Sequence, residues 1–141
     1  LNDAVRSAGR LDWRELVRTS LKAYLDILTE EPALAYVMHV EALIAGPALA
    51  GYRRRFSAMF ADRMRAARNI AVRSGELTGE LPSEIFNFII GGIDDRIRDC
   101  LQQRGPSALQ ELEPTLTYVA LTLLDTEPTG PAARIGKNWA R

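Results

Sequence analysis

The chain has 141 residues, of which 47% are hydrophobic and 26% charged, a balance typical of one folded domain that excludes disordered and low-complexity chains. Its 18 Lys and Arg residues equal its 18 Asp and Glu residues, so no excess positive charge is available to hold the chain on nucleic acid or on an anionic membrane. Cys100 is the only cysteine, which excludes an intrachain disulfide framework and a cysteine-built zinc site and favours a reducing, cytoplasmic location.

The ends and the apolar runs of the chain carry further information. The longest apolar runs are far shorter than the roughly 18 residues that suggest a membrane span, and the first residues lack a signal-peptide pattern. The chain begins with Leu1 rather than Met, which suggests a fragment of a longer protein. We expect residues 1–10 to be the end of a connecting helix.

A first helix is predicted from Asp12 to Glu31. Asp12 can accept from first-turn amides and Glu15 can reach back three residues, the arrangement of a capping box. Apolar residues follow at three-and-four spacing until Glu31, and Pro32 suits the first turn of the next helix.

Two further helices are predicted around the pair Gly46–Pro47. Residues 33–45 hold more apolar side chains than one buried stripe needs, which predicts a central helix surrounded on most sides. Gly46 and Pro47 predict a sharp turn into the next helix. That helix should be the longest in the chain and should end at Gly75, before a loop at 76–82.

The helix predicted at 82–104 carries apolar residues on two stripes, so two partners are needed to bury it. Gly91 and Gly92 interrupt it, and they indicate close approach of another backbone or a ligand. A last helix is predicted at 107–125, kinked or restarted at Pro114, followed by an extended or disordered tail at 126–141. The fold predicted is an all-α, antiparallel bundle of about five main helices.

Catalytic chemistry finds little support in the residues. His39, the only histidine, could pair with Cys100 as base and nucleophile, but a structural histidine and a small apolar cysteine are favoured. Asp94 and Asp95 precede Arg98 by four and three residues, spacings that serve ion pairs on a helix surface. The chain has no Glu-x-x-His pair for a di-metal site and no phosphate-binding glycine motif. We therefore predict no enzymatic activity, metal or cofactor.

Glu41 is placed by helical spacing among residues that look buried. A buried carboxylate must be paired or must bind something polar, so an ion pair with an arginine such as Arg63 is favoured over a ligand contact. Several large, adaptable side chains could either fill a core or line an apolar cavity. These are Tyr24, Met38, Phe56, Met59, Phe60, Met64 and Phe88.

The order of segments resembles the carboxy-terminal domain of TetR-family transcriptional regulators, over nearly the whole chain from about Asp12 to Leu124. The segments are a Trp-containing capped helix, EEPALAYVMHVEALIAGPAL at 30–49, a long Arg-rich helix, FIIGGIDDRIRDCLQQRG at 88–105 and LQELEPTLTYVALTLL at 109–124. Such regulators read DNA through an amino-terminal helix-turn-helix, for which this chain has no segment, so it should not bind operator DNA itself.

The resemblance implies a small-molecule cavity and a homodimer formed by helices 82–104 and 107–125. The residues expected at the ligand are Tyr24, Met38, Glu41, Phe56, Met59, Phe60, Arg63 and Phe88. Those expected at the dimer interface are Ile85, Ile89, Gly92, Arg96, Leu116, Val119 and Leu123.

The resemblance thus predicts an effector-sensing, homodimerising domain. Its ligand is expected to be small and largely apolar and to alter DNA binding by a separate helix-turn-helix domain. The alternative is a helical adaptor that binds a partner protein through the surface at 82–125.

Overall fold

The computed structural model describes residues 12–128, and every regular element in that range is helical. The predicted all-α helical bundle is confirmed. The predicted connecting helix at 1–10, and the tail beyond residue 128, lie outside the described residues. The elements are α2 (Trp13–Glu30), α3 (Pro32–Tyr36), the π-helix η1 (Val37–Glu41), α4 (Ala42–Ile44), α5 (Pro47–Arg73), α6 (Ser83–Gln103), the 3-10 helix η2 (Pro106–Leu112) and α7 (Glu113–Leu124).

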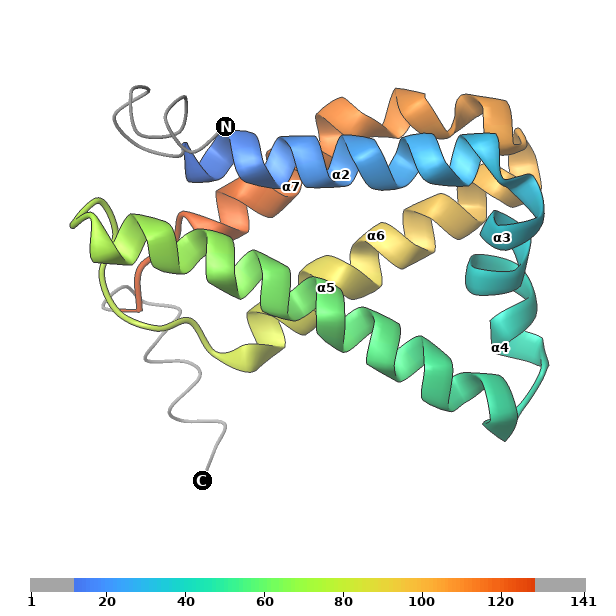
Figure 1. The fold of residues 1–141 in the computed structure, drawn as a ribbon, viewed down its shortest axis with the longest axis horizontal. Helices are drawn as coiled ribbons and strands as arrows, with labels where there is room; N and C mark the ends of the chain where they lie inside the picture. Colours follow the sequence, from blue (N-terminus) through green and yellow to red (C-terminus); the bar gives the residue numbers. More distant parts are fainter. Residues whose placement is uncertain (1–11, 129–141) are drawn as a thin grey trace, which may run out of the picture.

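Helices α2 and α5 form the two long sides of a wedge (Figure 1). They run in opposite directions, lie close together where α2 begins, and diverge toward the segment from α3 to α4 that joins their distant ends. Helix α6 crosses behind this wedge and contacts α5, while α7 and η2 pack along α2. No helix in the described range is both long enough and apolar enough to span a membrane.

The helix ends follow the predicted signals. Asp12 caps α2 by accepting from the backbone amide of Arg14 at 3.0 Å, and Glu15 pairs with Arg18 instead of reaching back. Gly46 has a positive φ of 80°, which glycine adopts without steric cost, and Pro47 opens α5. Helix α5 is the longest, at 27 residues, as predicted.

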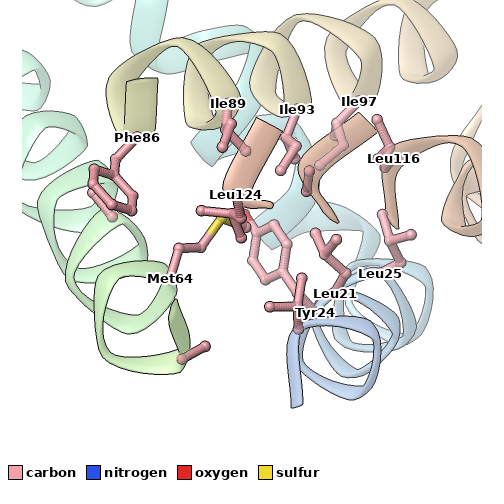
Figure 2. Packing of buried hydrophobic residues seen from close by; sticks show 14 of the residues in the cluster. Leu21, Tyr24, Leu25, Met64, Phe86, Ile89, Ile93, Ile97, Leu116 and Leu124 are labelled. Carbon is pink, nitrogen blue, oxygen red and sulfur yellow. The ribbon is translucent and has the colours of Figure 1, made fainter. Parts of the chain in front are cut away.

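The hydrophobic core lies where α2, α5, α6 and α7 meet (Figure 2). The side chains that Figure 2 labels in this core are Leu21, Tyr24, Leu25, Met64, Phe86, Ile89, Ile93, Ile97, Leu116 and Leu124. Ile89 is 3% exposed and Leu116 is 6% exposed, so the prediction that both face outward is wrong. The buried stripe of α6 runs through Phe86, Ile89, Ile93 and Ile97, a spacing of three and four residues that places Ile89 on the inner face.

The prediction of a central, surrounded helix at 33–45 is also wrong. The segment includes the π-helix η1, and its buried residues repeat at the four- and three-residue spacing of one narrow helical face. Its buried residues are Ala35, His39 and Ala42, whereas Ile44 is 83% exposed. Tyr36 and Val40 pack partly against the core, whereas Leu34, Val37, Leu43 and Ile44 are exposed, so much of the apolar density in this segment is surface.

Arg68 ties the loop between α5 and α6 to the end of α7. It is 2% exposed, and its guanidinium donates to the carbonyl oxygens of Leu124 at 2.9 Å, Gly79 at 2.6 Å, Thr78 at 3.2 Å and Thr126 at 2.9 Å. Burial lowers the pKa of Arg68 from its ordinary value. The hydrogen bonds offset the cost of burying the charge and fix the closed side of the wedge.

Candidate functional site

The wedge between α2 and α5 holds an open cleft of about 1010 Å³, which we call the main cleft. Its α5 side comes from positions at three-and-four spacing, among them Tyr52, Phe56 and Met59. The lining residues are Thr19, Ser20, Ala23, Tyr24, Ile27, Leu28, Leu34, Met38, Leu49, Tyr52, Arg55, Phe56, Met59, Phe60 and Arg63. This lining includes most of the residues predicted at a ligand, namely Tyr24, Met38, Phe56, Met59, Phe60 and Arg63.

Three aromatic rings form the inner wall of the main cleft. The ring centroids of Tyr24 and Phe60 are 4.8 Å apart, those of Phe56 and Phe60 are 4.9 Å apart, and those of Tyr24 and Phe56 are 5.6 Å apart. All three pairs are tilted, the kind of arrangement that aromatic rings favour over face-to-face stacking. The wall is thus apolar and held in shape by its own packing.

A polar network lies behind the aromatic wall. The Tyr24 hydroxyl lies 2.5 Å from Nε2 of His39, and Nδ1 of His39 lies 2.8 Å from Oδ1 of Asp94. Oδ2 of Asp94 accepts from both Arg53 and Arg98. The Nε of Arg98 also donates to the backbone carbonyl of His39 at 2.7 Å. We call these five residues the Asp94 network; they join α2, η1, α5 and α6.

Asp94 is ionised in this network. Burial opposes its ionisation, but hydrogen bonds from His39 and Arg98 and the positive charge of Arg53 outweigh that cost, so the pKa of Asp94 lies below its ordinary value. An ionised carboxylate only accepts hydrogen bonds, so His39 donates through Nδ1. Burial, reinforced by the charge of Asp94, raises the pKa of Tyr24 far above its ordinary value and keeps its phenol protonated.

A small pocket of about 30 Å³, room for about one water molecule, borders both the Asp94 network and the aromatic wall of the main cleft. His39, Arg53 and Asp94 line it, together with side chains that also line the main cleft. The shared side chains are Tyr24, Met38, Phe56 and Phe60. A change in the position of these four side chains would therefore alter the surroundings of the Asp94 network.

The chain matches no family model, and comparison with curated proteins and with solved structures finds no match. Its resemblance to the TetR family therefore stays a prediction.

Two residues predicted at the ligand lie elsewhere. Glu41 is exposed because it lies off the helical face that buries Ala35, His39 and Ala42, and among the ion pairs of residues 12–128 none joins it to Arg63. Phe88 is 72% exposed on α6 and is absent from the lining of the main cleft. Neither residue lines the main cleft, so both predictions are wrong.

The outer face of α6 differs from the predicted one. Gly92 and Arg96 are exposed as predicted, and Ile85 is half-buried against the core. Phe88 lies one turn before Gly91 and Gly92, and a Cβ atom added at either glycine meets nothing within 4 Å. The close approach that the paired glycines indicate is therefore not made within the described part of the protomer.

On α7, two other predicted interface residues remain accessible. Val119 is 44% exposed, and Leu123 is half-buried. Tyr118, which the sequence did not single out, is 72% exposed. The accessible residues of α6 and α7 form apolar surface that the rest of residues 12–128 does not cover.

His39 and Cys100 do not form the catalytic pair considered above. The His39 ring contacts Tyr24 and Asp94, whereas the Cys100 thiol lies 3.9 Å from the carbonyl oxygen of Gly105. The predicted ion pair between Asp94 and Arg98 is confirmed. Sequence spacing gave no signal for the longer-range partners of Asp94, since Arg53 and His39 are 41 and 55 residues away along the chain.

Proposed function

We propose that this chain is the effector-sensing and homodimerising domain of a TetR-like transcriptional regulator. In this proposal a small, largely apolar ligand occupies the main cleft, and DNA binding falls to a helix-turn-helix domain outside residues 12–128. The observation that carries the proposal is the main cleft itself, with its volume of about 1010 Å³ and its aromatic inner wall.

The main cleft has the size and chemistry of a small-molecule site. Pockets for such ligands are concave, mostly apolar and largely preformed, with volumes of roughly 300 to 1,000 Å³. Apolar and aromatic side chains dominate this cleft, and hydroxyls of Thr19 and Ser20 add polar contacts. Large side chains at its mouth, such as Ile27 at 48% exposed and Tyr52 at 63% exposed, gain burial when a ligand binds.

The Asp94 network supplies a physical link from the main cleft to α6. Tyr24 belongs both to the cleft wall and to the network, and Asp94 and Arg98 belong to α6. A ligand that pushes Tyr24 or Phe56 biases the position of α6 relative to α2 and α5. Because α6 presents its outer face to a second copy in this proposal, ligand binding changes the geometry of the dimer.

The adaptor alternative rests on the exposed aromatic residues of α6 and α7. Phe88 and Tyr118 are each 72% exposed and could contact a different protein as well as a second copy. The two functions differ in the size of the isolated protein: a regulator is a dimer by itself, whereas an adaptor changes size only with its partner.

Ligand binding is tested with N-phenyl-1-naphthylamine, a neutral fluorescent probe of apolar sites. Ala23 is exposed and lines the main cleft, so Ala23→Trp places an indole across the cleft without disturbing the core. We expect the wild-type protein to bind the probe at a single saturable site and Ala23→Trp to weaken binding at least about tenfold. Ala58→Trp is the matched control, because Ala58 is exposed on α5 and lines no described cleft. Equal binding by both variants would contradict the proposed site.

A further inference from the structure

The charged residues that line the main cleft are all of one sign. Arg55 and Arg63 line it, and no aspartate or glutamate does. The whole chain is electrically balanced, with 18 basic and 18 acidic residues, so this one-sided lining is a local feature. A cleft with apolar walls and cationic groups at its edge is complementary to a molecule with an apolar body and a negative charge.

Neither arginine forms an ion pair with an acidic residue in the part of the chain that the structure describes. Among the ion pairs of residues 12–128, none involves Arg55 or Arg63. Each instead lies over an aromatic ring: the guanidinium carbon of Arg55 is 4.8 Å from the centroid of the Tyr52 ring, and that of Arg63 is 5.8 Å from the centroid of the Phe60 ring. Such stacking orients a guanidinium and leaves its N–H donors free for an anion.

The third arginine near the cleft differs from these two. Arg53 lines the small inner pocket, and Asp94 already pairs with it and with Arg98. The Asp94 network is therefore internally compensated and offers no free charge to a ligand. Of these three arginines, the two without an acidic partner among the described residues are the two that line the main cleft.

Arg63 is the better placed of the two free arginines. Ser20 lines the main cleft one helical turn before Tyr24, and Arg63 lines it one turn after Phe60. Tyr24 and Phe60 are packed against each other, with ring centroids 4.8 Å apart, so the antiparallel course of α2 and α5 brings Ser20 and Arg63 to the same end of the cleft (Figure 1). The two residues also line a second, adjoining cleft together. A hydroxyl and a guanidinium thus border one end of an apolar groove.

We infer that the main cleft binds an amphipathic organic anion, such as a hydrophobic carboxylate. Its apolar body lies along the wall of Tyr24, Phe56 and Phe60, and its negative group pairs with Arg63 beside Ser20. Arg55, about 12 Å farther along the axis of α5, strengthens the attraction from the opposite end of the cleft. This inference rests on the proposed function, which it narrows from apolar ligands in general to anionic ones.

A matched pair of probes separates charge from apolar burial. N-phenyl-1-naphthylamine and 1-anilinonaphthalene-8-sulfonate share the same ring system, and only the second carries a sulfonate. We expect the wild-type protein to bind the sulfonate about three- to tenfold more tightly than the neutral probe, since a charge-assisted hydrogen bond at a partly exposed site contributes that much. Raising the salt concentration should weaken binding of the sulfonate and leave the neutral probe unaffected.

Single substitutions test whether Arg63 causes the preference for the sulfonate probe. Arg63→Met keeps an apolar stem of similar length and should remove most of the preference for the sulfonate, with the dissociation constant of the neutral probe unchanged. Arg55→Met should reduce the preference by a smaller factor. Arg54→Met is the control, because Arg54 is exposed on the same helix and lines no described cleft.

The possible results separate the anion inference from the proposed function on which it rests. Equal affinity for the two probes, or a preference that survives Arg63→Met and Arg55→Met together, overturns the anion inference while the apolar site stands. If the neutral probe does not bind, or binds equally well to Ala23→Trp, the proposed function itself fails.

Discussion

Asp94 is the residue that holds the inner end of the site together. Its carboxylate faces two arginines and a histidine, and it is the one acidic residue among the side chains that line the small inner pocket. Without it, Arg53 loses its ion-pair partner among the described residues, Arg98 keeps only the longer contact with Asp95 at 3.9 Å, and His39 loses the acceptor that sets its orientation. We therefore expect Asp94 to matter for stability even though it lies on a polar edge of α6.

Replacing Asp94 by Asn should lower the free energy of unfolding by about 2–3 kcal/mol. Breaking a fully buried ion pair costs about 3–5 kcal/mol. The loss expected for Asp94→Asn is smaller because the Asp94 side chain keeps some solvent contact. Urea denaturation followed by circular dichroism measures the change. Asp95→Asn is the control: that side chain is 60% exposed, so its loss should change stability by less than about 0.5 kcal/mol. Equal effects of the two substitutions would show that the Asp94 network carries no special stability.

The contribution of Asp94 should also depend on pH. Its pKa is lowered in the folded protein from the ordinary value of 3.8, so the folded state favours the ionised form. The resulting stability is fully present above about pH 5 and is lost as pH falls below about 4 and through the lowered pKa. The difference in unfolding free energy between wild type and Asp94→Asn should therefore shrink between about pH 6 and pH 3. A difference that stays constant over this range would contradict the assignment.

Sequence reasoning succeeded for residues whose role follows from helical spacing. Phe56, Met59 and Phe60 repeat at intervals that place large side chains on one face of α5, and the structure places them on one cleft with Tyr24 of α2. It did not reveal the partners of His39, because Tyr24 and Asp94 lie on other helices and no local pattern encodes them. It also failed for Glu41, since the apolar residues on its face, such as Val37 and Ile44, are exposed, and spacing alone does not tell an exposed apolar face from a buried one.

At the scale of elements, helix boundaries were predictable because capping residues and helix-breaking residues act on their immediate neighbours in the sequence. Asp12 and the Gly46–Pro47 pair each mark a boundary that the structure shows. The faces of the helices were less predictable. On α6 the two apolar stripes were recognised, but Ile89 was assigned to the wrong one, because adjacent stripes on a helix differ by only one residue position.

The outer face of α6 leads to a prediction about assembly. We expect the wild-type protein to be a dimer in sedimentation velocity at micromolar concentration and Phe88→Glu to be a monomer. Phe88 is 72% exposed beside the open space at Gly91 and Gly92, so a charge there disrupts a contact between copies without entering the core. Ala58→Glu, at an exposed position of α5, should leave the dimer intact.

Two results would count against this interface. If the wild-type protein sediments as a monomer, the proposed homodimer is contradicted and the adaptor alternative is favoured. A dimer that persists in Phe88→Glu would place the contact elsewhere. Circular dichroism of the variant should match the wild type, because an exposed substitution leaves the helices unchanged.

At the scale of the whole molecule, the structure combines a rigid part and an open part. Arg68 and the core fasten α2, α5, α6 and α7 at one end of the wedge, whereas the main cleft lies where α2 and α5 diverge (Figure 1). The Asp94 network spans from the cleft wall to α6. An arrangement of this kind lets a ligand in the cleft act on a surface that the ligand does not touch.

The most direct test of this coupling is amide hydrogen–deuterium exchange with and without N-phenyl-1-naphthylamine. The account predicts slower exchange in the cleft segments of α2 and α5, and also a several-fold change in the middle of α6 at residues 90–98, with both effects lost in Ala23→Trp. Protection confined to α2 and α5, with exchange in α6 unchanged while the probe is bound, would contradict it.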